Sequence, residues 1–354
     1  MSQLPVPQTR LKHITLLRAF AIVLVVLGHS TRNTATPNFN MFNPSLTSFI
    51  EILVQKYIYS FHMPLFFWIS GYVYLYTSKD KNELSTVLKE IYRKFKRLII
   101  PLYSTLFLVV LPIRLIFGQI SENFTNIIKT SLLCQNVDHL WFLKDLFLVF
   151  IIIIPVSPQI RKAPLLTSCL YFIIILALSY NRTNTPAFAE GALEYLPFFY
   201  AGYMTKRFEI LPSGKTALLI SILFFFLHAS ISYVSLSGVD RPFPHTNLIW
   251  YCMAFCGTYY MYYLAVYVCQ THAIDKIWNL VVVLDKSSYT IFLFHVVFLY
   301  MVLFLFYSAQ LENPLYRIIP SFFFGLFVPI FIDYALARTK LLALLFSKHY
   351  AKIV

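Results

Sequence analysis

Charged residues are scarce in this sequence of 354 residues: they make up 12% of the chain, against 58% hydrophobic residues. So few polar side chains cannot cover a water-soluble globule of this size. The nine glycines exclude a collagen-like repeat, and the five cysteines include no CxxC pair, which excludes the commonest zinc and redox motifs. Lipid must therefore cover much of the surface of the folded chain.

Acidic residues are the scarcer charged type, since 15 Asp and Glu against 29 Lys and Arg give a formal net charge of +14. A nucleic-acid-binding protein would concentrate such an excess on one soluble module, and no soluble module is visible here. Neither a nucleic-acid partner nor a bound metal is expected. Cys252 and Cys256 share a helix face, but ordinary packing accounts for them.

Long hydrophobic runs recur along the chain with short polar breaks between them. A helix that spans a membrane needs about 20 mostly apolar residues. Ten runs approach or meet that length, so the sequence predicts an all-α integral membrane protein with about ten transmembrane helices. The runs cover residues 14–30, 49–76, 98–117, 139–156, 165–180, 193–205, 216–236, 248–269, 287–307 and 315–337. The membrane domain is predicted to extend over residues 14–338.

The distribution of Lys and Arg predicts the orientation of these helices, because cytoplasmic segments retain positive charge. If the N-terminal side is placed inside, the inner segments hold 20 Lys and Arg and the outer loops hold five. Both termini, residues 1–13 and 339–354, are then cytoplasmic. Residues 79–97 are strongly charged and amphipathic, and we expect them to lie at the inner membrane surface.

The first hydrophobic run carries two ionisable residues on one helix face. Arg18 and His29 are eleven residues apart, which brings them within roughly 20° of each other around the helix and about 16 Å apart along it. Charged or titratable groups inside a membrane are costly and often mark a functional site. The alternative is structural: Arg18 reaches the inner headgroups and His29 satisfies the end of its helix.

Three further histidines lie in or beside the hydrophobic runs. His62 precedes Pro64, which breaks the backbone hydrogen-bond ladder and suits the wall of a cavity. His139 begins the segment HLWFL, and His295 ends the segment SSYTIFLFH. Each has the alternative of a buried histidine that makes a local hydrogen bond.

A basic cluster leads directly into the third hydrophobic run. It consists of Arg93, Lys94, Lys96 and Arg97. Such a cluster can anchor a helix to anionic lipid, or it can bind the phosphates of a ligand, since arginine contacts phosphate with two parallel hydrogen bonds.

Taken together, the motifs resemble the acyltransferase 3 family of membrane acyltransferases, and in particular its branch of fucose 4-O-acetylase-like sugar O-acetyltransferases. The matching segments occur in family order: Arg18-x10-His29, FHMPLFFWISGY (61–72), KRLIIPLY (96–103), HLWFL (139–143), YLPFFYAGY (195–203) and SSYTIFLFH (287–295). One departure is the basic pair before the third helix. The family usually has two arginines three residues apart, whereas this chain has Lys94 and Arg97, or Arg93 and Lys96.

The resemblance implies transfer of an acetyl group from acetyl-CoA to a hydroxyl of a glycan, in the inner membrane of a bacterium. His29 would act as general base or carry the acetyl group as an acyl-imidazole. The residues expected to bind the CoA phosphates are Arg18, Arg93, Lys94, Lys96 and Arg97. Candidate carboxylate partners of His29 are Asp145 and Glu194, and the residues expected to contact the glycan are His62, Ser70, Tyr72, His139, Trp141 and His295. A transporter or flippase for a glycan or small metabolite is the alternative, because intramembrane His and Arg also suit a translocation path.

Overall fold

The computed structural model describes residues 12–31, 57–77, 83–116, 123–135, 137–164, 188–236, 245–309, 314–336 and 338–346, together with 166, 167 and 170. Within these residues every regular element is a helix, which agrees with the predicted all-α fold. The long helices are α1 (Lys12–Thr31), α3 (His62–Thr77), α4 (Leu84–Thr105), α7 (Trp141–Lys162), α9 (Glu190–Arg207), α10 (Gly214–Leu236), α11 (His245–Gln270), α12 (Trp278–Ser308) and α13 (Pro314–Leu336). The short elements are η3 (Leu106–Val110), α5 (Leu111–Ile116), α6 (Phe124–Leu132), η4 (Asp138–Leu140), η6 (Asp275–Ile277) and α14 (Lys340–Leu345).

Helices occupy nine of the ten predicted spans in the part of the chain that the structure describes, and the fifth span, 165–180, lies largely outside it. Among the described residues, six helical segments are long and apolar enough to cross a membrane: Lys12–Thr31, Leu84–Ile116, Asp138–Lys162, Ile249–Gln270, Asp275–Phe306 and Arg317–Leu336. The chain is therefore a multi-pass helical membrane protein. The total of ten spans and the cytoplasmic termini stay predictions.

The charged segment expected at the inner surface is joined directly to the third span. Helix α4 runs from Leu84 to Thr105 and continues through the π-helical turn η3 into α5. Pro101 lies within it and has no N–H, so the carbonyl of Arg97 one turn earlier loses its helical partner. The hydroxyl of Tyr289 on α12 donates to that carbonyl at 2.6 Å. This bond satisfies the carbonyl and lets the helix continue past the proline.

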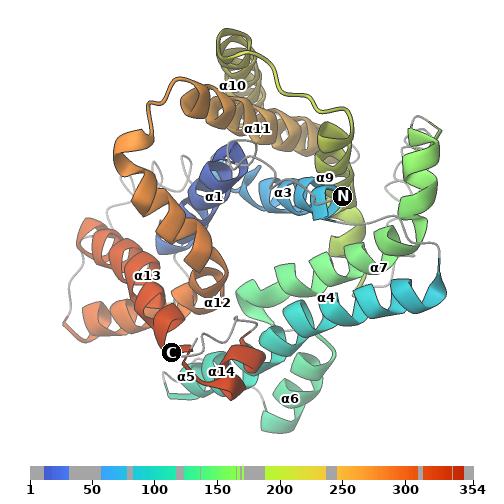
Figure 1. The fold of residues 1–354 in the computed structure, drawn as a ribbon. Coiled ribbons are helices and arrows are strands. Elements are labelled where there is room, and N and C mark those ends of the chain that lie inside the picture. Colours follow the sequence, from blue (N-terminus) through green and yellow to red (C-terminus); the bar gives the residue numbers. More distant parts are fainter. Residues whose placement is uncertain are drawn as a thin grey trace.

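Helix α1 lies in the interior of the bundle, where it packs against α3, α11, α12 and α13 (Figure 1). Helix α3 lies beside α1 and crosses α9 closely. A Cβ atom added to Gly71 of α3 would collide with the carbonyl of Phe199, and one added to Gly202 of α9 would collide with that of Trp68. Glycine at both positions is what permits this close approach of the two backbones.

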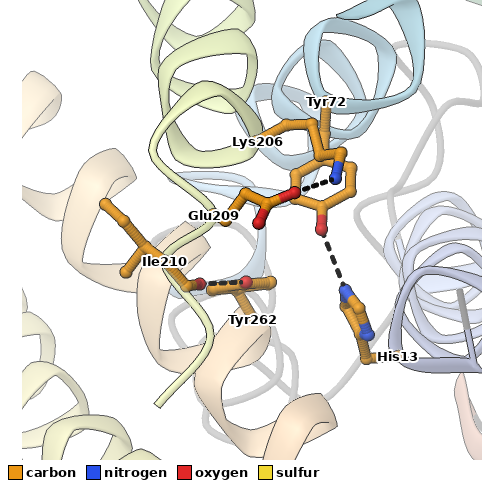
Figure 2. A network of polar contacts seen from close by, with 6 residues as sticks. All are labelled: His13, Tyr72, Lys206, Glu209, Ile210 and Tyr262. Carbon is orange, nitrogen blue, oxygen red and sulfur yellow. Dashed lines mark hydrogen bonds and ion pairs between the residues drawn. The ribbon is translucent and has the colours of Figure 1, made fainter. Parts of the chain in front are cut away.

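We call the end of the bundle where α1 begins the proximal end, and the end where it finishes the distal end. A polar network ties four helices together at the proximal end (Figure 2). His13 of α1 bonds the hydroxyl of Tyr72 on α3 at 3.3 Å, and Tyr262 of α11 donates to the carbonyl of Ile210, just after α9, at 2.6 Å. The rings of His13 and Tyr262 also meet edge to face, with their centroids 5.8 Å apart. Tyr72 therefore takes part in helix packing at the proximal end.

Candidate active site

Three of the predicted histidines converge near the distal end of the bundle. The ring centroids of His29 on α1 and His295 on α12 are 5.0 Å apart, and those of His295 and His139 are 5.1 Å apart. His139 belongs to η4, the turn that begins the α7 segment. His139 and His295 are buried, with 3% and 0% of their surface exposed. We call these three residues the histidine cluster.

The backbone hydrogen bonds of two members fix which ring nitrogens carry hydrogen. Nδ1 of His295 contacts the carbonyls of Ile291 and Phe292 at 3.0 and 2.9 Å, and Nε2 of His139 contacts that of Leu293 at 3.2 Å. A carbonyl only accepts, so these nitrogens are the donors. The opposite nitrogen of each neutral ring then bears a lone pair. Both of those nitrogens are buried and have no hydrogen-bond partner among the described residues. The cluster can therefore accept hydrogen bonds, or protons, from hydroxyl groups.

A tyrosine connects the fourth predicted histidine to the cluster. The ring of Tyr59 lies 6.1 Å from His29 and 4.7 Å from His62, centroid to centroid. A Cβ atom at Gly28 would come within 2.9 Å of the Tyr59 ring, so glycine leaves the space that this ring fills beside α1. His62 itself donates from Nδ1 to the carbonyl of Ile58 at 3.0 Å. The ring of Tyr59 therefore contacts both His62 and His29.

A cavity of about 340 Å³ lies between α1, α3, α4, α7 and α12, on the proximal side of the histidine cluster. Arg18, Lys94 and Arg97 line it where these helices approach the proximal end, and no acidic side chain is among its described lining residues. Ser70 also lines the cavity, and its hydroxyl donates to the carbonyl of Phe66 at 2.8 Å. Three of the five predicted phosphate-binding cations are thereby brought to one cavity.

The cations of the cavity differ in their partners. Arg18 forms an ion pair with Asp285 of α12, with Nε 2.5 Å from Oδ1. The ammonium of Lys94 lies 3.9 Å from the centroid of the Phe150 ring and 5.5 Å from that of Tyr74. Both rings present their negative faces to the ammonium. The cavity therefore carries a net positive charge at its proximal end, which suits an anionic ligand.

The other two predicted cations, Arg93 and Lys96, are exposed on α4 and do not line the cavity. The ammonium of Lys96 lies 4.7 Å from the ring of Tyr92 on its own helix. Of the two basic residues of α4 that do line the cavity, Lys94 is half-buried and Arg97 is exposed.

The predicted carboxylates gather on a different pair of helices. Asp145 of α7 lies 3.2 Å from the ammonium of Lys144, interacts electrostatically with Glu194 of α9 and borders Gly191. Trp141 packs against Tyr195 of α9, with ring centroids 5.3 Å apart. The ring of His29 contacts those of Tyr59 and His295.

One aromatic residue belongs to both the cavity and the surroundings of the histidine cluster. Phe292 lines the cavity, and its ring centroid is 5.8 Å from that of His139 and 6.2 Å from that of His295. No motif or spacing in the sequence singles out this phenylalanine, Tyr59 or Asp285. No group of three His, Cys, Asp or Glu side chains in the described ranges is arranged to hold a metal ion.

These features define a helical membrane protein with buried imidazoles next to a cationic cavity. A family model described as an acyltransferase domain matches residues 11–334, which include all the elements above except α14 and the end of α13. The chain therefore belongs to the acyltransferase 3 family and is a membrane acyltransferase. Comparisons with curated proteins and with solved structures give no match.

Proposed function

We propose that this protein is an O-acetyltransferase of the sugar-modifying branch of its family, which moves an acetyl group from acetyl-CoA to a hydroxyl of an envelope or exported glycan. The observation that supports this proposal most directly is the order of groups along the bundle. A cationic cavity suited to CoA phosphates is followed, toward the distal end, by the histidine cluster. A donor bound by its phosphates at the proximal end would direct its thioester toward the imidazoles.

In the proposed reaction, neutral His29 takes the proton of the acceptor hydroxyl as the hydroxyl oxygen attacks the thioester carbonyl. The C–O bond of the new ester forms, the C–S bond breaks, and CoA leaves as a thiol after accepting the proton. His139 and His295 would orient the acceptor, since their lone pairs can accept hydrogen bonds from other hydroxyls of the sugar. Transient acetylation of His29 is the other route to the same products.

Purified protein supplied with acetyl-labelled acetyl-CoA and bacterial membrane glycans tests this function. Label should pass to the glycan fraction, with release of one CoA thiol for each acetyl group transferred. Transport of a glycan across sealed vesicles without labelling would instead support the alternative of a transporter.

The proposal places the proximal end in the cytoplasm, where acetyl-CoA is made available, and its basis is the 20-to-5 distribution of Lys and Arg. Reporter fusions after Lys89 and Lys348 should be active only with a cytoplasmic reporter. Fusions after Arg32, Arg182 and Arg241 should be active only with an external one. An external position for Lys89 would reverse the orientation and remove the donor site from the cytoplasm.

Lys94→Ala and Arg97→Ala are each expected to weaken acetyl-CoA binding by about 10- to 100-fold, because each removes one charge-assisted contact to phosphate. Equilibrium binding to the purified protein measures the effect. Arg93→Ala and Lys96→Ala are the matched controls, since these exposed residues lie on the same helix but outside the cavity. Equal losses of affinity in all four variants, or no loss in any, would indicate that these four basic residues anchor α4 to lipid and do not bind the donor.

A further inference from the structure

Three phenylalanines from three helices meet where the cavity approaches the histidine cluster. Phe142 of α7 packs against Phe66 of α3 and Phe292 of α12, with ring centroids 5.8 and 5.4 Å apart. All three line the cavity. We call these residues the phenylalanine partition.

The partition lies at the distal end of the cavity. Along α3 the lining residues run from Phe66 to Tyr74, and along α7 from Phe142 to Phe150, which is about 12 Å in each case at 1.5 Å per residue. Both helices run from the distal to the proximal end, so Phe66 and Phe142 are the most distal lining residues of their helices. None of the three imidazoles lines the cavity. The partition therefore separates the cationic cavity from the histidine cluster.

The rings of the partition are supported from behind by further aromatic residues. Phe67 contacts Phe142 at a centroid distance of 5.0 Å and stacks on Tyr195 at 4.7 Å, with only 10° between those two planes. Phe67 is fully buried, and Phe142 and Phe292 expose 8% and 6% of their surface. A close-packed surrounding of this kind gives way little when additional atoms are inserted.

From this geometry we propose that the phenylalanine partition selects the acyl group of the donor by its length, and restricts the reaction to acetyl and similarly short chains. The inference rests on the proposed function, in which the thioester approaches the imidazoles from the cavity. An acetyl group carries a single methyl beyond the carbonyl carbon, whereas each added methylene must find space against the three rings. One methylene changes the selectivity of a well-packed pocket by about 10- to 200-fold.

Membranes that contain the full chain, supplied in turn with acetyl-, butanoyl- and hexanoyl-CoA labelled in the acyl group, test the proposal. The readout is the label transferred to membrane glycan, expressed as the ratio of kcat/KM for acetyl to that for hexanoyl. The unaltered protein should favour acetyl by at least about 10-fold. Phe292→Ala and Phe66→Ala should each lower this ratio toward one. Phe294→Ala is the matched control, because Phe294 lies on the same helix, is equally buried at 6% and packs against Phe346.

Three results would overturn the proposal. Equal use of hexanoyl-CoA by the unaltered protein would show that no length limit exists. A ratio that stays the same in Phe66→Ala and Phe292→Ala would show that the length limit lies elsewhere. If the Phe292→Ala protein does not accumulate, the Phe66→Ala variant alone tests the proposal, since the Phe66 side chain is only partly buried and its loss should be tolerated better. Absence of any transfer from acetyl-CoA by the unaltered protein would reject the proposed function itself, and is thereby distinguishable from a failure of length selection.

Discussion

His29→Ala is expected to lower the rate of acetyl transfer by about 10²- to 10⁴-fold, the range for loss of a general base, while acetyl-CoA binding is retained. The physical reason is that the substitution removes the proton acceptor but leaves the cationic cavity unchanged, since His29 is not among its lining residues. Transfer to glycan and equilibrium binding of acetyl-CoA, measured on the same preparation, separate the two effects.

His228 provides the matched control for this experiment. It is a fully buried histidine on α10 whose Nε2 lies 2.8 Å from the hydroxyl of Ser60, outside the histidine cluster. His228→Ala should lower the stability and yield of the protein and leave the rate per folded molecule nearly unchanged. Near-normal transfer by a well-expressed His29→Ala variant would reject His29 as the base. Nδ1 of His139 and Nε2 of His295, which have no hydrogen-bond partner in the described part of the chain, would then be the next candidates.

The helices could largely be predicted from the sequence, because a bilayer demands long apolar runs and these are visible in one dimension. The relation of Arg18 to His29 was also accessible, since both lie on a single helix whose geometry is known. In the structure, Arg18 lines the cavity and His29 belongs to the histidine cluster. Local periodicity thus predicted one helix face of the site.

The convergence of His139 and His295 could not be predicted in the same way. These residues are 156 positions apart in the sequence, and their contact depends on how the α7 segment packs against α12, which no local pattern specifies. The phenylalanine partition could not be predicted from the sequence for a different reason. The chain contains 35 phenylalanines, so composition offers no basis for choosing three of them.

Asp285 was overlooked because the predicted ninth span began at residue 287, after the charged pair of Asp285 and Lys286. In the structure α12 begins earlier, at Trp278, and includes Asp285 on the side that faces Arg18. A search for uncharged runs therefore left out Asp285, although its carboxylate pairs with the predicted phosphate-binding residue Arg18. This pairing gives Arg18 two possible roles, as a structural partner of α12 and as a ligand for the donor.

Substitution of both members of the pair is expected to separate these roles. Arg18→Ala alone should lower the free energy of unfolding by about 3 kcal/mol. This value is at the low end of the range for breaking a buried ion pair, because a third of the Arg18 side chain is exposed. Addition of Asp285→Asn should recover most of that loss, since no carboxylate is then left without its cation. Thermal unfolding in detergent measures both changes.

The same variants are then compared for acetyl-CoA affinity, which reports the second role. If Arg18 contacts a phosphate of the donor, the stable double variant should still bind acetyl-CoA about 10- to 100-fold more weakly than the unaltered protein. Asp285→Asn alone should bind it more tightly, because the guanidinium no longer has a carboxylate competing with the phosphate. Normal affinity in the double variant would assign Arg18 to the α1–α12 contact alone and leave phosphate binding to Lys94 and Arg97.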